Sequence, residues 1–282
     1  MESGMRLADF FEADEVRLVE PLFSDLCYKE MDDLLLQIPA ERSRILIDEN
    51  EEILSVGLET GDGIIQASCF HLRTPSDTLI NRLEDMEGDI YQVSWEDFED
   101  TVRSYYSEHL INTSAVASDD LNPERLQITR DLIRSFAGTE HGLRCLDCCC
   151  GTGIGSYLMR DMGLNPLSYD NDDALLARGF AEGRLIPERT MWIDGRLLKA
   201  YLTEPVDCAF GFMFGELQPF NHDIWSEIVS SICAVSERVL ITVGTEPEAG
   251  IIKEWMKAGG CNPEVWENDR DPIYDRWVCS IE

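Results

Sequence analysis

The chain has 282 residues and a formal net charge of −32, from 55 Asp and Glu against 23 Lys and Arg, and 44% of its residues are hydrophobic. That hydrophobic content is enough for a buried core in one large domain or two modest ones, so a disordered chain is excluded. No apolar run approaches the roughly 20 residues that cross a bilayer, and the first residues are acidic, unlike a signal peptide. We therefore expect a cytoplasmic protein with no membrane partner.

Both halves of the chain carry the excess of acidic residues. A surface of that sign repels phosphate backbones and lacks the Lys and Arg residues that give affinity for nucleic acid. We therefore expect no nucleic-acid partner, and we interpret the acidity as an adaptation for solubility rather than for a cationic partner.

Ten cysteines are present, and four of them crowd into residues 145–150 of an apolar run. Disulfide scaffolds belong to small secreted chains, so we expect these cysteines to be reduced. The spacing of Cys145 and Cys148 permits a metal ligand pair, but no second pair follows and the four histidines are scattered. We therefore expect no metal site.

Residues 1–118 are predicted to form a mostly helical N-terminal domain. Helices are expected over residues 15–38, 76–85 and 95–111, with Ser76 and Ser94 as N-caps. Residues 45–69 fit either a glycine-interrupted helix or a hairpin, and we favour the helix. We expect this domain to form much of the substrate pocket, with a stabilising cap or an oligomer interface as the alternative.

Residues 119–282 alternate short apolar runs with longer amphipathic stretches, which predicts repeated β-α units and a largely parallel sheet. Asn122 and Pro123 mark the start of the first helix. The predicted strands cover residues 143–149, 166–169, 190–193, 206–214 and 238–244, with a terminal antiparallel pair at 264–268 and 276–281. The predicted helices cover residues 121–137, 156–162, 173–183, 224–235 and 249–258.

The sequence LDCCCGTGIGS places an acid, Asp147, at the end of a predicted strand and three glycines in the turn that follows. Glycines 151, 153 and 155 let the turn adopt positive φ angles and let a ligand approach the main chain, while the next helix points its amides at that ligand. A dinucleotide-binding loop has similar geometry. Its fingerprint G-x-G-x-x-G requires a glycine or another small residue at position 156, and Ser156 satisfies this requirement only in part.

The pattern D-x-x-x-G-x-G-x-G resembles the first motif of the class I S-adenosylmethionine-dependent methyltransferases. This resemblance covers residues 119–282 and implies an α/β, Rossmann-like, mostly parallel seven-stranded sheet with an antiparallel terminal strand. It also implies S-adenosylmethionine as cofactor, with a carboxylate (Asp170) for the ribose hydroxyls and an acid (Asp194) for the adenine amino group. The implied cofactor-binding residues are Asp147, Gly151, Thr152, Gly153, Gly155, Asp170, Asn171, Asp194, Gly195 and Phe212.

Simpler roles stay open for the two acids: Asp170 as the cap of the following helix, and Asp194 as a turn former. The segment GFMFGELQPF after the fourth strand differs from the motif with which amino-methylating DNA enzymes of this family hold their base. A small-molecule or protein acceptor is therefore expected.

Methyl transfer requires alignment of nucleophile and methyl group and, for some acceptors, a base. The polar candidates for these catalytic roles are Glu216, His222, Tyr105 and Tyr106. Two other classes remain open: a non-catalytic S-adenosylmethionine-binding or interaction protein, and a nucleotide-cofactor oxidoreductase.

Overall fold

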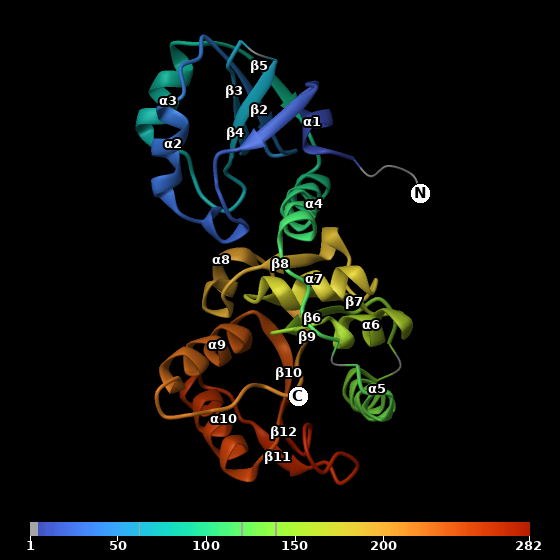
Figure 1. Cartoon of the computed structure of the whole chain (residues 1–282). Coiled ribbons are helices and arrows are strands. Elements are labelled where there is room, and N and C mark those ends of the chain that lie inside the picture. The colour runs from blue at the N-terminus through green and yellow to red at the C-terminus, as the bar shows by residue number, and fades with distance from the viewer. Residues whose placement is uncertain (1–4, 62, 120, 139) are drawn as a thin grey trace. The chain divides into compact units, whose positions relative to one another are not determined.

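The computed structural model describes residues 5–61, 63–119, 121–138 and 140–282, which divide into two compact units, residues 1–109 and 110–282 (Figure 1). Each unit has its own β-sheet. In the described part of the chain, no helix combines the length and the apolar character that crossing a membrane requires.

The first unit contains a five-stranded sheet in the order β1-β4-β3-β2-β5. β3 pairs with β2 and β4 in antiparallel register, whereas β1 and β5 join the two flanks in parallel. The strands are β1 (Glu15–Leu18), β2 (Arg42–Ile47), β3 (Ile53–Glu59), β4 (Ile64–Cys69) and β5 (Glu87–Gln92). The helices are α1 (Leu7–Phe10), α2 (Asp32–Leu36), α3 (Asp77–Glu84) and α4 (Trp95–Thr113), with short 3-10 turns at Phe23–Asp25 and Lys29–Met31.

The prediction of a mostly helical N-terminal domain is wrong. The helix expected over residues 15–38 is interrupted at Pro21, which cannot donate a helical hydrogen bond, and its first residues form β1 instead. The helix favoured over residues 45–69 is also wrong, because this segment forms β2, β3 and β4. Gly61 and Gly63, both with positive φ, belong to the turn between β3 and β4 rather than to an interrupted helix.

Two predictions in the first unit are confirmed, the helices α3 and α4. The Ser76 side chain caps α3 by accepting a hydrogen bond from the Leu79 amide, and Ser94 accepts one from the Asp97 amide at the start of α4. A core formed by β3 and α3, with Val56, Leu58, Leu79 and Leu83 buried, holds these elements together. Burial on both faces of β3 hides the alternating pattern that would have identified a strand.

The second unit contains a seven-stranded sheet in the order β11-β12-β10-β9-β6-β7-β8. All pairs are parallel except those of β12, which runs antiparallel to β10 and β11. The strands are β6 (Arg144–Cys148), β7 (Asn165–Asp170), β8 (Thr190–Trp192), β9 (Val206–Gly211), β10 (Ser236–Val243), β11 (Glu264–Glu267) and β12 (Trp277–Ile281). The predicted parallel sheet and terminal antiparallel pair are confirmed.

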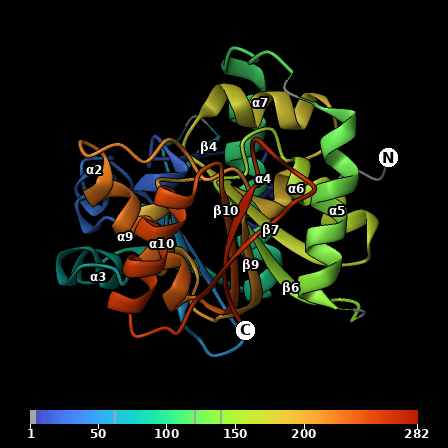
Figure 2. The same cartoon turned by 90° about the horizontal axis from the view of Figure 1, so that it is seen from below.

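Helices cover both faces of this sheet: α5 and α6 lie on one side of the strands, and α9 and α10 on the other (Figure 2). The helices are α5 (Pro123–Ala137), α6 (Ile154–Asp161), α7 (Asp173–Ala181), α8 (Leu198–Tyr201), α9 (His222–Ala234) and α10 (Glu246–Ala258), with 3-10 turns at Pro187–Arg189 and Gly195–Leu197. Asn122 caps α5, as predicted, by accepting from the Glu124 amide. Apolar residues of α5 and α6, among them Leu132, Phe136 and Leu158, pack on β6 and β9 to form a hydrophobic core.

The strand order reverses between β6 and β9, since the chain proceeds from β6 toward β7 and β8 on one side and from β9 toward β10 on the other. At such a switch point the connections leave in opposite directions and open a crevice at the carboxyl ends of the strands. The fold therefore places a ligand site at the ends of β6, β7 and β9.

Candidate functional site

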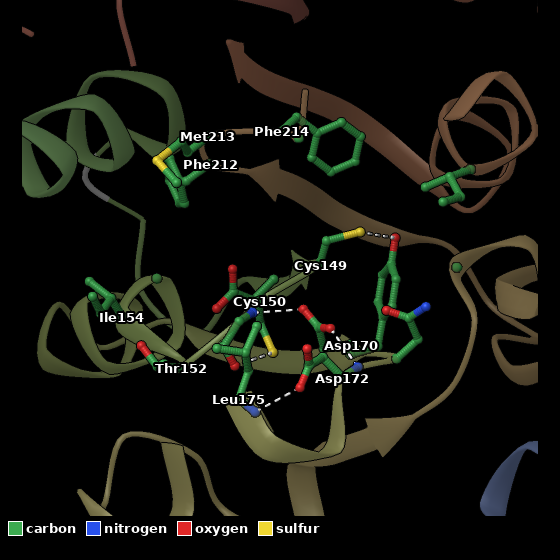
Figure 3. Close-up of a pocket in the computed structure, with 18 of the residues that line it drawn as sticks. Cys149, Cys150, Thr152, Ile154, Asp170, Asp172, Leu175, Phe212, Met213 and Phe214 are labelled. Carbon is green, nitrogen blue, oxygen red and sulfur yellow. Dashed lines mark hydrogen bonds between the residues drawn. The ribbon is translucent and has the colours of Figure 1, made fainter. Parts of the chain in front are cut away.

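A cavity of 540 Å³ lies at this switch point, within the size range of pockets that hold small molecules and cofactors. Its lining comes from the segments that follow β6, β7, β8 and β9, together with residues of α5 and α9. In Figure 3, Phe212, Met213 and Phe214 lie across an open space from Cys149, Cys150 and Asp170. Nine of the ten predicted cofactor-binding residues line it, namely Asp147, Gly151, Thr152, Gly155, Asp170, Asn171, Asp194, Gly195 and Phe212.

The tenth residue, Gly153, shapes the glycine turn without lining the cavity. Its φ of 76° is in the left-handed region, and a Cβ there would lie 2.5 Å from the Leu185 side chain. Gly151 and Cys149 also have positive φ, of 53° and 50°. Glycine adopts such angles at no steric cost, whereas Cys149 pays for them, and backbone strain of this kind is concentrated at functional sites.

Asp147, at the end of β6, fastens the glycine turn to the strand. Its carboxylate accepts hydrogen bonds from the Ser156 amide (2.7 Å) and the Ser156 hydroxyl (2.6 Å). A Cβ on Gly155 would lie 2.6 Å from Asp147 Oδ1, so only glycine fits opposite the acid. Asp147 is 2% exposed, and this burial raises its pKa to about 7 against the opposing effect of the Ser156 hydrogen bonds.

Asp170 ends β7 and faces the glycine turn (Figure 3). Its Oδ2 accepts from the Gly151 amide at 2.8 Å, and its Oδ1 accepts from the Asp172 amide at 2.9 Å. Burial raises the pKa of this carboxyl, while the main-chain hydrogen bonds act in the opposite direction. The helix cap for α7 is Asp172, which accepts from the Ala174 and Leu175 amides, so Asp170 is not needed for capping.

Asp194 follows β8 and serves the turn in which it lies. It accepts from the Arg196 amide and forms a two-pronged ion pair with the Arg196 guanidinium, at 3.0 and 2.6 Å. The Arg196 hydrogen bond holds the pKa of Asp194 below its usual range. The turn-forming role that the sequence left open is therefore present in the structure, beside the cavity.

The segment after β9 forms an apolar wall of the cavity. The strand ends at Gly211, three residues before the predicted end, because Met213 adopts a left-handed backbone with a φ of 52°. The Trp225 ring packs where a Cβ of Gly215 would lie, and it contacts Phe214 at a centroid distance of 4.8 Å. The sequence predicts that the fourth strand ends near Phe212–Gly215, whereas the contribution of Trp225 from α9 depends on the fold.

The ionisable side chains that line the cavity are predominantly acidic. Four lining residues are carboxylates: Asp147, Asp170, Asp172 and Asp194. Arg125 is the single basic side chain among the described lining residues, and its Nε and Nη2 donate to Asp275 at 2.9 and 2.7 Å. Asp275 is 0% exposed and also accepts from the Met213 amide and the Thr242 hydroxyl. The sequence carries no signal for this pair, because Arg125 and Asp275 are 150 residues apart.

The four residues expected to be catalytic do not line the cavity. The Tyr105 hydroxyl accepts from the Leu18 amide, and the Tyr106 hydroxyl donates to the Glu20 carbonyl, so both tyrosines support the first unit. His222 begins α9 and packs against Trp255, at a ring distance of 5.5 Å. Glu216 is exposed, and its carbonyl accepts from the Asn221 side chain. These assignments placed polar residues by their distance along the chain, which does not determine where a loop points its side chains.

All ten cysteines are free. No group of three or more His, Cys, Asp or Glu side chains that could hold a metal ion occurs among the residues that the structure describes. Burial raises the pKa of Cys149 and Cys150, which line the cavity as neutral thiols. The crowded cysteines therefore contribute neutral, partly apolar surface at this end of the sheet.

No protein-family model matches the sequence, and no curated protein matches it. Solved structures that resemble it include a magnesium protoporphyrin IX methyltransferase from Synechocystis with bound S-adenosylmethionine, at 12% identity over 65% of this chain and 97% of that chain, with a TM-score of 0.43. A TehB-like S-adenosylmethionine-dependent methyltransferase from Corynebacterium glutamicum is 18% identical over 64% of this chain and 96% of that one, with a TM-score of 0.40.

TrmN from Thermus thermophilus is 16% identical over 55% of this chain and 48% of that one, with a TM-score of 0.42, and a putative RNA methyltransferase from Pyrococcus horikoshii is 14% identical over 64% and 94%, with a TM-score of 0.41. The named acceptors differ among these proteins, so the likeness does not select an acceptor. By its own strand order, its one antiparallel strand and its glycine turn, the second unit has the Rossmann-like fold of the class I methyltransferases.

Proposed function

We propose that the protein is an S-adenosylmethionine-dependent methyltransferase whose cofactor lies in the cavity of the second unit. The observation that carries this proposal is the carboxylate of Asp170, which faces the glycine turn from the end of the neighbouring strand. Each of its oxygens accepts one main-chain hydrogen bond, which leaves further lone pairs for two vicinal hydroxyls of a ribose. Asn171, Ile193 and Gly195 lie next along the lining, where an adenine ring would follow the ribose.

The charge of the cavity favours a sulfonium cofactor over a dinucleotide. A pyrophosphate needs cationic partners or free amides, whereas four carboxylates line this cavity and its one arginine is paired with Asp275. S-Adenosylmethionine carries a sulfonium and an ammonium group against one carboxylate, so its net positive charge complements the lining. The oxidoreductase alternative is therefore not favoured.

The cofactor supplies an electrophilic methyl group, and the protein's residues have to bind, orient and shield the reactants. Asp170 and the glycine turn hold the nucleoside and the amino-acid ends, and Asp147 keeps the turn in place through Ser156. The wall of Phe212, Met213 and Phe214 lies across the cavity from Asp170, where an acceptor would enter (Figure 3). The role expected for residues 1–118, recognition of the acceptor, stays a prediction.

Calorimetric titration of the full chain tests this proposal. S-Adenosylhomocysteine should bind with one site per chain, and NADH should not bind. Asp170→Asn should weaken S-adenosylhomocysteine binding by about 1–3 kcal/mol, the cost of lost charge-assisted hydrogen bonds, or roughly 5- to 150-fold. Glu227→Gln, which removes an exposed acid from α9, is the matched control and should bind as the parent does. NADH binding without S-adenosylhomocysteine binding would refute the proposal.

We propose a small molecule or a protein as the acceptor, since the net charge of −32 opposes a polyanion. Incubation of the protein with methyl-labelled S-adenosylmethionine and a fractionated cell extract distinguishes a methyltransferase from a non-catalytic binding protein. Label in a small-molecule or protein fraction supports the proposal, and label confined to RNA contradicts the acceptor class. A protein that binds the cofactor but labels nothing would be a binding protein.

A further inference from the structure

The part of the cavity across from Asp170 has a composition that restricts the acceptor more narrowly. This part, which we call the acceptor wall, consists of Phe212–Gly215 with Ile224 and Trp225. Met213 is 47% exposed and Ile224 is 44% exposed, although both are apolar and line the cavity. Apolar side chains left uncovered at the rim of a cavity favour a ligand that covers them with an apolar body.

In the described lining of the cavity, the carboxyl groups that could remove a proton from an acceptor are all aspartates. Lysine, histidine and glutamate do not occur among the described residues that line the cavity. Asp147 and Asp170 accept hydrogen bonds from the main chain of the glycine turn, and Asp194 is paired with Arg196. Asp172 caps α7. Each carboxylate is thus engaged by groups on the side of the cavity where the cofactor is proposed to lie, including Ser156 of α6 for Asp147 and Gly151 for Asp170.

The one basic side chain in the described lining of the cavity is already paired. The guanidinium of Arg125 is held by the fully buried Asp275 and lies 3.7 Å from Asp271. Burial raises the pKa of Cys149 and of Tyr169, so these groups stay neutral. An alcohol, phenol or thiol reacts as its anion, and forming that anion among four carboxylates without a free cation is unfavourable.

We propose that the methyl acceptor is a small amine with an apolar body, an inference that rests on the function proposed above. Its ammonium form is attracted by the carboxylates and by the faces of the aromatic rings. The bound ammonium first passes one proton to water. The neutral amine then attacks the methyl carbon with its lone pair and gains the methyl group as the carbon–sulfur electron pair returns to sulfur, which leaves the methylated product as an ammonium ion.

Binding to the full chain saturated with S-adenosylhomocysteine tests the inference without turnover. The probes are 2-phenylethylamine, 2-phenylethanol and 3-phenylpropionate, which share a ring and differ in charge. We expect the amine to bind at least 10-fold more tightly than the carboxylate, with the alcohol between them. Equal or tighter binding of the carboxylate overturns the inference. Failure of S-adenosylhomocysteine itself to bind refutes the proposed function instead, so the two failures are distinct.

Substitutions locate the effect within the cavity rather than on the acidic surface. Phe212→Leu should weaken amine binding to the saturated protein at least 5-fold, whereas Phe220→Leu should change it less than 2-fold, because Phe220 is 86% exposed and does not line the cavity. Equal effects of the two substitutions would assign the amine to the surface and overturn the inference.

Release of Arg125 provides a second, independent test. Asp275→Asn removes the nearer of the two carboxylates beside the guanidinium and leaves Asp271 at 3.7 Å, so the 10-fold preference for the amine over 3-phenylpropionate should narrow at least 3-fold. Asp131→Asn, which removes an ion-pair partner of Arg134 from the same helix outside the cavity, is the control and should leave the preference unchanged. Arg125→Gln removes the guanidinium altogether, so the preference for the amine over 3-phenylpropionate should stay the same or widen. This variant tests the inference even where Asp275→Asn does not fold. A preference that Asp275→Asn widens, or that Arg125→Gln abolishes, overturns the inference.

Discussion

Replacement of Asp147 by Asn should stabilise the protein relative to the parent, and this gain in the free energy of unfolding should increase from acidic to alkaline pH. The carboxyl is 2% exposed, and its pKa rises from the ordinary 3.8 to about 7 because burial disfavours the charged form. The folded state therefore binds the proton more tightly than the unfolded state. The contribution of Asp147 to stability is fully present below pH 3.8 and is lost as the pH rises through 7.

The size of this effect follows from the shift. A difference of about 3 pKa units corresponds to about 4 kcal/mol. By linkage, ionisation of Asp147 therefore lowers the parent's free energy of unfolding by roughly 1.5 kcal/mol at pH 5 and by about 4 kcal/mol at pH 8. Asn keeps an oxygen that can accept from the Ser156 amide and hydroxyl, so the geometry of the turn survives. The variant should gain about 2–3 kcal/mol on the parent between these two pH values.

Urea-induced unfolding of both proteins, followed by circular dichroism at pH 5, 6, 7 and 8, measures this gain. The acidic chain also destabilises itself as its other carboxylates ionise, and taking the difference between variant and parent removes that common effect. Asp223→Asn, which removes one exposed carboxylate from α9, controls for the change in net charge. A difference between Asp147→Asn and the parent that does not vary from pH 5 to pH 8 would refute the reasoning.

Three further predictions follow from particular contacts. Gly155→Ala should lower the free energy of unfolding by about 1–3 kcal/mol, because its Cβ would meet the buried Asp147 carboxylate. Gly250→Ala, in α10 with no atom within 4 Å of its Cβ, should raise the free energy of unfolding by roughly 0.5–1 kcal/mol. Thermal unfolding of both variants measures the two changes. Asp194→Asn should weaken S-adenosylhomocysteine binding less than Asp170→Asn does, since Arg196 already engages Asp194; calorimetry showing the reverse order would restore the adenine contact that the sequence predicts. Duplex DNA and bulk RNA should not bind in 0.1 M salt, as filter binding can show, and an affinity that falls steeply with added salt would contradict this.

The sequence by itself determined the second unit. Strands alternate there with amphipathic helices, and Gly151, Gly153 and Gly155 follow an acid at a strand end. Local signals therefore predict the strands and the longer helices, and the parallel sheet places the strand ends together. Nine of the ten predicted cofactor-binding residues consequently line one cavity. The signal is strong because glycine turns and helix caps act within a few residues along the chain.

The tertiary structure decided the rest, because those features depend on partners distant in sequence. The apolar residues of β3 are buried on both faces, so no alternation distinguished a strand from a helix, and only pairing with β2 and β4 settles it. The surroundings of the catalytic candidates depend on distant partners in the same way, since the Tyr106 hydroxyl donates to a carbonyl 86 residues away. Arg125 is neutralised by Asp275 only when α5 meets the loop between β11 and β12, and that contact sets the charge at the acceptor's end of the cavity. Charge and burial at a site belong to the folded arrangement, whereas turns and periodicity belong to the chain.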